Sequence, residues 1–180
     1  MNKAIVFLAE GFEEVEALTV VDVLRRGGVE VTTMSVTEDP YVLGAHDVEV
    51  LADADNEYDV SEADMLVLPG GMPGALNLRK SSVVCDAVED FAASGKLVGA
   101  ICAAPYVLGE LGVLKGKKAT CYPGFEDKLQ GAAYTATRVQ RDGNIITGNG
   151  PSSALPFALA LLAAIADEDT AQQVADGRLV

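Results

Sequence analysis

A cysteine at position 102 lies where an apolar strand is expected to give way to a helix. The segment reads Gly99-Ala100-Ile101-Cys102-Ala103-Ala104-Pro105. A nucleophile on such a turn projects without obstruction, and small neighbours leave room for a substrate. A helix beginning at Ala103 would direct unpaired N–H groups at the sulfur, which favours the thiolate and lowers the thiol pKa. We interpret Cys102 as a reactive thiol; the alternative is a small buried hydrophobe, as free cysteines usually are.

A catalytic cysteine usually has a histidine partner, and His46 is the only histidine of the sequence. It lies far from Cys102 along the chain, so a Cys–His protease arrangement is poorly supported. The proton carrier is therefore sought among the carboxylates.

Glu16 is the carboxylate whose position is unusual. Helical spacing places it between Phe12 and Val20, on a partly apolar face. Desolvation there would raise its pKa, so that it could carry a proton and hydrogen-bond to a thiolate. A solvated position in the first helical turn is equally open for Glu16, and it fits Glu13 and Glu14 better.

A glycine-rich segment, Pro69-Gly70-Gly71-Met72-Pro73-Gly74, follows another apolar strand. It matches neither the P-loop nor the dinucleotide-binding pattern, which argues against a nucleotide phosphate site. Glycines just past a strand allow backbone N–H groups to point at a shared site. Gly71 and Ala103 could thus form an oxyanion hole, although a plain turn is equally compatible with these residues.

The elements expected to position these residues alternate along the chain. Apolar runs predict strands and periodic stripes predict helices. The expected strands are 3–9, 29–36, 65–68 and 96–101, with a minor strand at 47–51 and part of 113–122; residues 52–62 form an acidic loop or short helix, and the expected helices are 13–26, 81–94, 103–111, 153–166 and 168–175. A hairpin over 135–147 should turn at Asp142-Gly143. This order predicts an α/β fold with an open, mostly parallel sheet, helices on both faces and functional residues at the carboxyl ends of strands.

Composition bounds the class of protein. With 180 residues and no linker, the chain is expected to form a single domain over 1–180. A formal net charge of −14 argues against nucleic acid and anionic membranes as partners. The longest apolar run, 154–166, is shorter than a membrane span.

The cysteines and the N-terminus bear on compartment and cofactors. Cys85, Cys102 and Cys121 are an odd number without C-x-x-C spacing, which suggests neither a disulfide framework nor a zinc site. The apolar run 4–9 is too short for a signal peptide core. We expect a cytoplasmic protein without metal or cofactor.

Taken together, several segments resemble the ThiJ/PfpI superfamily and, within it, the DJ-one-like branch of the parkinsonism-associated protein deglycase. They occur in order and at matching intervals, and the resemblance covers nearly the full chain. The matching segments are 9–16, 21–28, 68–71, 100–105 and the pair Gly150-Pro151.

The resemblance implies a flavodoxin-like three-layer sandwich and a homodimer. It assigns the nucleophilic, redox-sensitive role to Cys102 and the protonated acid to Glu16. It also places the pair Asp22 and Arg26 near a dimer interface, although an ordinary surface ion pair would look the same.

Two positions depart from the family pattern. Tyr122 stands where many members carry a histidine close to the cysteine, so chemistry that needs an imidazole base is in doubt. His46 stands where relatives place an arginine at the pocket mouth, so it would meet an anionic group only when protonated.

The resemblance favours a cofactor-independent cysteine enzyme that acts on small reactive carbonyls or their protein adducts, as a glyoxalase or deglycase does. A redox-sensing or chaperone-like stress protein using Cys102 is the alternative. A cysteine peptidase is disfavoured because of Tyr122.

Overall fold

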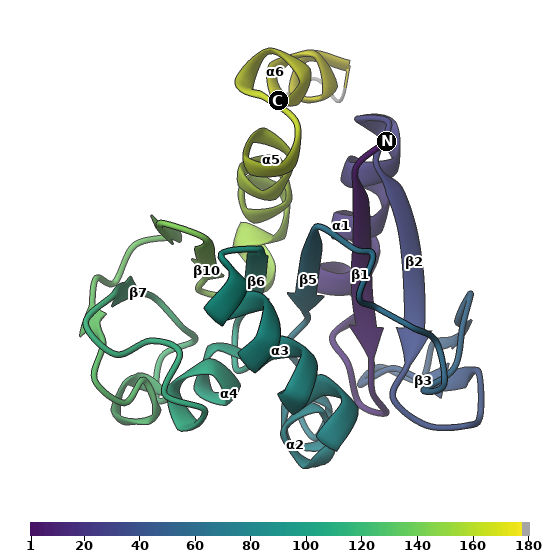
Figure 1. Cartoon of the computed structure of the whole chain (residues 1–180), viewed down its shortest axis with the longest axis horizontal. Coiled ribbons are helices and arrows are strands. Elements are labelled where there is room, and N and C mark those ends of the chain that lie inside the picture. The colour runs from purple at the N-terminus through teal and green to yellow at the C-terminus, as the bar shows by residue number, and fades with distance from the viewer. Residues whose placement is uncertain (178–180) are drawn as a thin grey trace.

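The computed structural model describes residues 1–177, and its centre is a six-stranded sheet (Figure 1). The strand order is β2-β1-β5-β6-β10-β9, in which neighbouring strands are parallel except for the antiparallel pair β9 and β10. The predicted mostly parallel sheet is thus confirmed. Its strands are β1 (Lys3–Leu8), β2 (Glu30–Ser35), β5 (Met65–Leu68), β6 (Leu97–Ile101), β9 (Val139–Asp142) and β10 (Ile145–Gly148).

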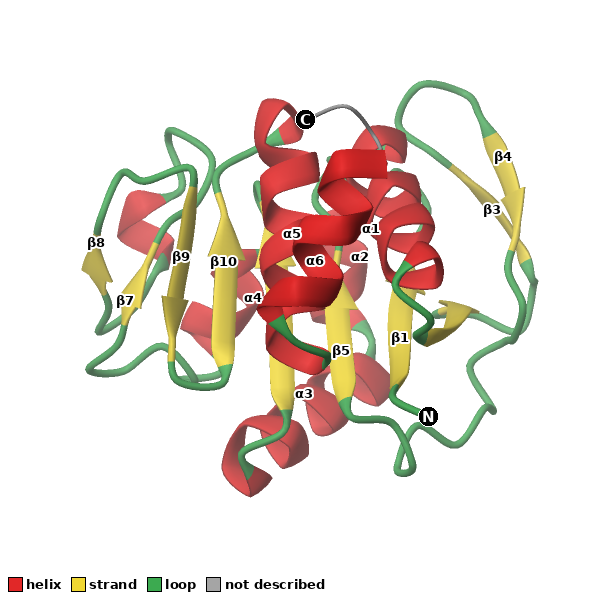
Figure 2. Ribbon diagram, turned by 90° about the horizontal axis from the view of Figure 1, so that it is seen from above, coloured by secondary structure: helices red, strands yellow, loops and turns green. Residues whose placement is uncertain are grey.

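Helices cover both faces of this sheet, so the fold is the expected three-layer α/β sandwich (Figure 2). One face carries α1 (Glu14–Arg26), α5 (Ala154–Ile165) and α6 (Glu168–Gly177); the other carries α2 (Gly74–Lys80), α3 (Ser82–Ser94) and α4 (Pro105–Glu110). Within residues 1–177, none of the helices is long and apolar enough to span a membrane.

Shorter elements complete the description. They are the hairpin β3 (Tyr41–Leu43) and β4 (Glu49–Leu51), the parallel pair β7 (Lys118–Ala119) and β8 (Ala133–Tyr134), and the 3₁₀ turns η1 (Glu126–Lys128) and η2 (Pro151–Ser153).

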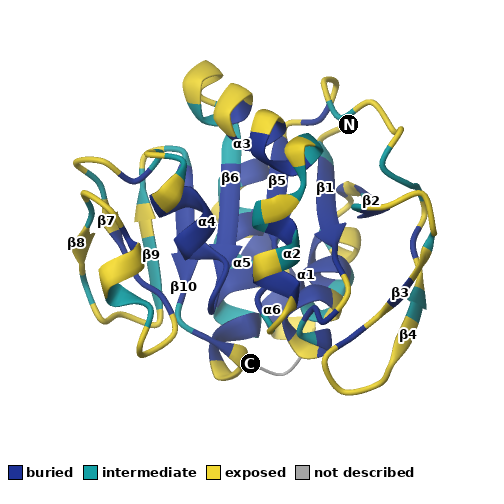
Figure 3. Ribbon diagram, turned by 90° about the horizontal axis from the view of Figure 1, so that it is seen from below, coloured by how far each residue is buried: buried dark blue, intermediate teal, exposed yellow. Residues whose placement is uncertain are grey.

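The two layers of core follow from the pleat of the strands. Successive side chains of a strand point to opposite faces, so Val6 and Leu8 of β1 join the core under α1 and α5, whereas Ile5 and Phe7 join the core under α2 and α3. All four residues are buried, and β1 is accordingly dark blue in Figure 3. The continuous apolar runs of the sequence are therefore required by burial on both faces.

The strand order places a topological switch point between β1 and β5. The chain moves from β1 outward to β2, and then returns to place β5 on the other side of β1. Loops that leave the carboxyl ends of such strands diverge and form a crevice in which open α/β sheets bind ligands. The loop before α1 and the segment 69–74 leave these two strands, and Cys102 follows the next strand, β6.

The structure corrects several expected boundaries. The helix after the cysteine begins at Pro105 rather than Ala103, which agrees with the preference of proline for a first helical turn. Asp142 pairs with Ile145, so the two-residue hairpin loop is Gly143-Asn144. Residues 113–122 contribute only the two-residue β7. Helix α2 and strand β3 have too few residues for periodicity to reveal.

Candidate active site

The Cys102 elbow is a strained turn at the end of β6. Its φ of +64° lies in the left-handed region that non-glycine residues seldom occupy. The backbone holds this conformation through Cys102 N–H, which donates to Gly148 O at 2.9 Å, and Cys102 O, which accepts from Tyr122 N–H at 2.8 Å. Such strain is found where surrounding structure fixes a functional side chain. The cysteine is 8% exposed, so the thiol is largely enclosed.

Glu16 lies in the first turn of α1 and is completely buried, which decides between the buried and solvated positions that the sequence left equally open. Its Oε2 accepts the N–H of Gly70 at 2.8 Å, and its carboxyl group lies close enough to the Cys102 side chain for each to shift the pKa of the other. The structure therefore brings together two residues that are 86 positions apart in the sequence.

Gly70 and Gly71 fit closely between these groups. A Cβ at Gly70 would lie 2.5 Å from both Glu16 Oε2 and Cys102 Cβ. Gly71 has a φ of +90°, and a Cβ there would collide with the backbone of the loop before α1. The N–H groups of Gly71 and Ala103 lie close enough to the Cys102 sulfur to lower its pKa. The two proposed oxyanion donors are therefore adjacent to the thiol.

Burial dominates the electrostatics of the pair. It raises the pKa of Glu16 to about 7, although hydrogen bonds from Cys102 and Gly70 oppose the shift. Burial and the nearby Glu16 carboxylate raise the pKa of the Cys102 thiol to about 12. The lowered thiol pKa predicted from a helix N-terminus is thus wrong when Glu16 is ionised. The N–H groups of Gly71 and Ala103 do lower the thiol pKa, but burial and the Glu16 charge outweigh them.

The two groups are best treated as one titrating unit, because two negative charges in a buried space repel strongly. The unit loses a first proton near pH 7 and the second only near 12. Sulfur and carboxylate compete for the single charge in between. The N–H groups of Gly71 and Ala103 lower the pKa of the sulfur, but burial and the Glu16 charge outweigh them. Because Glu16 loses its proton near pH 7, we place the charge on Glu16 and the remaining proton on Cys102.

His46 lies in the turn between β3 and β4, beside the start of α1. Its backbone N–H donates to Glu14 Oε1 at 2.7 Å, and its Nδ1 lies 2.9 Å from Glu14 Oε2 and 3.6 Å from Glu13 Oε1. The hydrogen bond with Glu14 and both carboxylate charges raise the pKa of His46, whose side chain is 67% exposed. The structure thus ties His46 to Glu13 and Glu14, with Glu13 in turn donating its backbone N–H to Gly70 O at 2.9 Å.

The expectation that Glu14 belongs to a solvated first turn is wrong. Glu14 is 8% exposed. Burial raises the pKa of Glu14. Hydrogen bonds outweigh this effect and lower the pKa: one involves the His46 side chain, and the others involve the backbone of Glu14, His46 and Val48. Glu14 is therefore the anchor that fixes the β3–β4 turn against α1, a role that α1 periodicity does not reveal.

Among the described residues, Glu13, Glu14 and His46 form the group whose spacing would suit a metal ion, with ligand atoms within 4.8 Å of one another. Both Glu14 oxygens are already hydrogen-bonded to His46. The arrangement is accounted for as an ion pair that anchors a loop.

Tyr122 lies close to the Cys102 turn, as the resemblance implied. Its backbone contacts Cys102 O, and its ring lies beside Gly150, where an added Cβ would be 3.2 Å from Cδ2. The side chain is 46% exposed. The backbone of Tyr122 therefore contacts the cysteine while its ring lies beside Gly150, and among the described residues this position carries no imidazole base.

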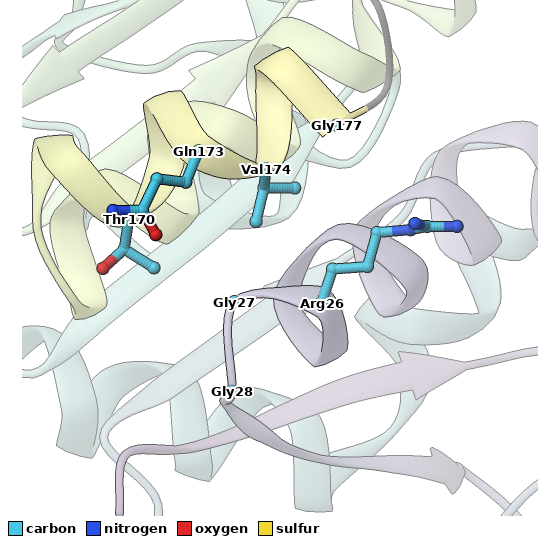
Figure 4. A pocket seen from close by; sticks show the side chains of 7 residues that line it. All are labelled: Arg26, Gly27, Gly28, Thr170, Gln173, Val174 and Gly177. Carbon is cyan, nitrogen blue, oxygen red and sulfur yellow. The ribbon is translucent and has the colours of Figure 1, made fainter.

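A cavity of about 520 Å³ lies at the other end of α1, between Arg26 and α6 (Figure 4). Its side chains come mainly from Thr170, Gln173 and Val174. None of these is a nucleophile or a general acid, so this cavity does not compete with the Cys102 site for the chemistry.

Gly70 is a site residue that the sequence analysis missed. Its N–H anchors Glu16, and its lack of a side chain allows Glu16 and Cys102 to approach. The pair Gly70-Gly71 after an apolar strand was the available signal, but residue types alone do not show which glycine faces which partner.

Comparison with known proteins identifies the family of this chain. Residues 2–164 match the model of the DJ-1/PfpI family. The chain is 39% identical to the protein dj-1beta of Drosophila melanogaster, over 99% of this chain and 97% of that protein. It is 36% identical to the Parkinson disease protein 7 homologue of Danio rerio, over 96% of this chain and 94% of the other.

Solved structures show the same fold. Oxidized DJ-1 of Toxoplasma gondii superposes with a TM-score of 0.95 at 37% identity, covering 99% of this chain and 98% of that one. Drosophila DJ-1beta gives a TM-score of 0.95 at 38% identity with the same coverage. With a family match along most of its length and relatives similar over nearly all of it, this chain belongs to the DJ-1/PfpI family.

Proposed function

We propose that this protein is a cofactor-independent cysteine enzyme that acts on small reactive carbonyls or their protein adducts, as glyoxalases and deglycases do. One observation carries the proposal: the enclosed Cys102 thiol lies beside a fully buried Glu16 whose pKa is about 7, and each group shifts the pKa of the other. A proton carrier works best when its pKa lies near the working pH.

For methylglyoxal, the reaction would begin when Cys102 Sγ attacks the aldehyde carbon. The C–S bond forms as the carbonyl π electrons move to oxygen, where the N–H groups of Gly71 and Ala103 can stabilise the negative charge. The Glu16 carboxylate accepts the thiol proton as the C–S bond forms and then delivers it to that oxygen, giving a hemithioacetal. In this way the shared proton of the pair replaces the imidazole that Tyr122 cannot supply.

The remaining steps are an isomerisation and a hydrolysis. Glu16, now a carboxylate, accepts the proton from the former aldehyde carbon and returns it to the neighbouring ketone carbon through an enediol. The product is a thioester of lactate, which water cleaves to lactate and the free Cys102 thiol. The aldehyde carbon is oxidised and the ketone carbon reduced, so no external redox partner is required.

The direct test measures lactate formed from methylglyoxal. Cys102→Ala and Glu16→Gln should each reduce turnover to the background rate, because one lacks the nucleophile and the other the proton carrier. Cys85→Ser is the matched control, since this buried thiol hydrogen-bonds with Arg79 on the far layer. Equal turnover by the parent and Cys102→Ala would contradict the proposal.

A redox-sensing or chaperone-like role is the second candidate, favoured by the Toxoplasma relative that was solved in oxidized form. Oxidation of Cys102 to a sulfinate would place new oxygens beside the Glu16 proton, which could hydrogen-bond to them. Mass analysis after mild peroxide should then locate the added oxygens on Cys102. Oxidation of Cys85 or Cys121 with Cys102 unchanged would reject this role, and it would not affect the turnover test.

We also infer a homodimer in the cytoplasm. Helix α1 exposes Val15 and Leu18, at 52% and 39%, and the adjoining β3–β4 turn exposes Val48 at 48%. A second copy of this chain would cover these apolar side chains. The odd number of free cysteines favours a reducing compartment.

A further inference from the structure

Another concave site lies near the amino ends of β5 and β6, whereas Cys102 follows the carboxyl end of β6. We name it the α3 groove: it runs between residues 59–61 and one face of α3, and encloses about 620 Å³. Val60, Val83, Ala87 and Phe91 form its apolar floor. Three of these recur at 83, 87 and 91, which places them on one stripe of the helix. The volume lies within the range of small-molecule sites.

The rim of the α3 groove is acidic. Asp59, Asp86 and Asp90 line it, and all three are exposed. Asp59 accepts the Ser61 N–H at 2.9 Å, which keeps its carboxylate in a fixed orientation. No salt bridge in the described chain involves any of these three carboxylates.

Lys96 is the one cationic residue among the described lining residues, and its ammonium group has partners other than the rim carboxylates. Lys96 Nζ donates to the carbonyl oxygens of Ser61 at 2.6 Å and Ala63 at 2.9 Å, and lies 4.7 Å from the centre of the Phe91 ring. These partners are backbone carbonyls and an aromatic face, not the rim carboxylates. The groove therefore combines an apolar floor with an excess of negative charge.

The position of the α3 groove separates it from the Cys102 chemistry. Residues 59–61 precede β5 and Lys96 precedes β6, so the groove lies where these strands begin. Cys102 and Gly71 follow the ends of the same strands. An occupant of the groove would thus not contact the Cys102 site.

We propose that the α3 groove binds a small organic amine, whose apolar body packs on the floor and whose ammonium group lies among the rim carboxylates. Charge complementarity favours a cationic ligand, because the groove is lined by three carboxylates and by a single ammonium group, that of Lys96, which is hydrogen-bonded to backbone carbonyls. The floor selects an apolar body, because a bare inorganic cation would leave Val60, Val83 and Ala87 in water. Phenethylamine is the simplest compound with both features.

The test measures binding of phenethylamine by calorimetry, with backbone NMR shifts to locate it. Phenethyl alcohol is the matched neutral probe and methylammonium the matched cation without an apolar body. We expect saturable binding of phenethylamine, with shifts at 59–61 and α3, and binding of either control probe at least about fivefold weaker. Cys102→Ala should leave the affinity unchanged, which separates this result from the proposed function.

Variants test the two features separately. The double variant Asp86→Asn/Asp90→Asn should weaken phenethylamine binding several-fold. Glu89→Gln is the control, because Glu89 is exposed on the same helix but does not line the groove. Ala87→Leu should fill the floor and prevent binding, and circular dichroism would establish that it folds.

Three results would overturn the proposal. Equal affinities for the amine and the alcohol would show that the carboxylates do not select a cation. Equal weakening by Glu89→Gln would show general attraction to an acidic surface. Binding of a basic, apolar tripeptide without any binding of phenethylamine would assign the groove to a protein partner instead.

Discussion

Cys102 and Glu16 depend on each other for their protonation states. Each group is buried, and ionisation of one opposes ionisation of the other. The N–H groups of Gly71 and Ala103 lower the pKa of the thiol, but burial and the Glu16 charge outweigh them, so the thiol keeps its proton after Glu16 has lost its own. A nucleophile and a proton carrier thus result from one shared proton, without a histidine.

A pH titration of Cys102 alkylation tests where that charge lies. With the charge on Glu16, the rate at which iodoacetamide modifies Cys102 should rise only well above the ordinary thiol pKa of about 8.5. Mass analysis of the modified peptide separates Cys102 from Cys85 and Cys121. A rate that rises through about pH 7 would place the charge on Cys102 instead.

Glu16 should also make folding stability depend on pH. Its pKa is raised in the folded state from 4.5 to about 7. The folded protein therefore binds the proton more tightly, and this stabilisation is complete below the unfolded pKa and is lost as pH rises through about 7. Relative to Glu16→Gln, the parent should lose roughly 3 kcal/mol of unfolding free energy across this interval.

Urea denaturation of both proteins at matched pH values would measure this difference. The comparison cancels the contribution of the other carboxylates, which titrate alike in both. A difference between parent and Glu16→Gln that stays constant with pH would show that the pKa of Glu16 is not raised.

At the scale of elements, the ends of β1 and β5 are fixed to each other by backbone hydrogen bonds. Gly74 N–H donates to Gly11 O at 3.2 Å, and Glu13 N–H to Gly70 O at 2.9 Å. On its other side the loop before α1 is held by the β3–β4 hairpin, through Gly11 N–H to Leu43 O at 2.8 Å. Backbone hydrogen bonds alone therefore fix the start of α1, and with it the position of Glu16, relative to the end of β5.

The anchoring of the hairpin through Glu14 predicts a titration that NMR can follow without ambiguity, because His46 is the only histidine. In the parent, the His46 pKa should lie above its ordinary value of 6.5. Glu14→Gln should bring it back toward that value, since the hydrogen bond to Glu14 is the largest cause of the shift. Glu10→Gln is the control, and an unchanged His46 pKa in Glu14→Gln would contradict the anchor.

At the scale of the whole molecule, apolar surface remains exposed on one layer of the sandwich. Val15 and Leu18 project from α1 toward solvent, because the buried face of the helix is formed by other residues, among them Ala17, Val20 and Leu24. The proposed homodimer gives this second apolar face a function.

Sedimentation velocity of Val15→Asp/Leu18→Asp tests the homodimer. The parent should sediment as a dimer at tens of micromolar, and the variant as a folded monomer, because two carboxylates would be buried at the interface. Leu76→Asp is the matched control, since Leu76 is also 39% exposed but lies on α2, in the other layer. A dimer that survives the double substitution would show that α1 is not the interface.

The sequence by itself determined the order of strands and helices, the mostly parallel sheet and the candidate residues Cys102, Glu16 and Gly71. These follow from local properties: apolar runs long enough for strands buried on both faces, stripes with helical spacing, and a cysteine at a strand end. Short elements such as α2 and β3 were not predicted, because they contain too few residues for a hydrophobic periodicity to be recognised. The helix after Cys102 was placed too early because Pro105, not the cysteine, sets its first turn.

Only the tertiary structure decided how the candidates act on one another. The direction of a pKa shift depends on burial and on charges brought close by folding, so the helix N-terminus alone gave the wrong direction for Cys102 while the apolar neighbours of Glu16 gave the right one. Gly70 and Glu14 acquired roles through partners 54 and 32 residues away. Contacts between residues so distant in sequence arise from the packing of strands and loops, which no local pattern records.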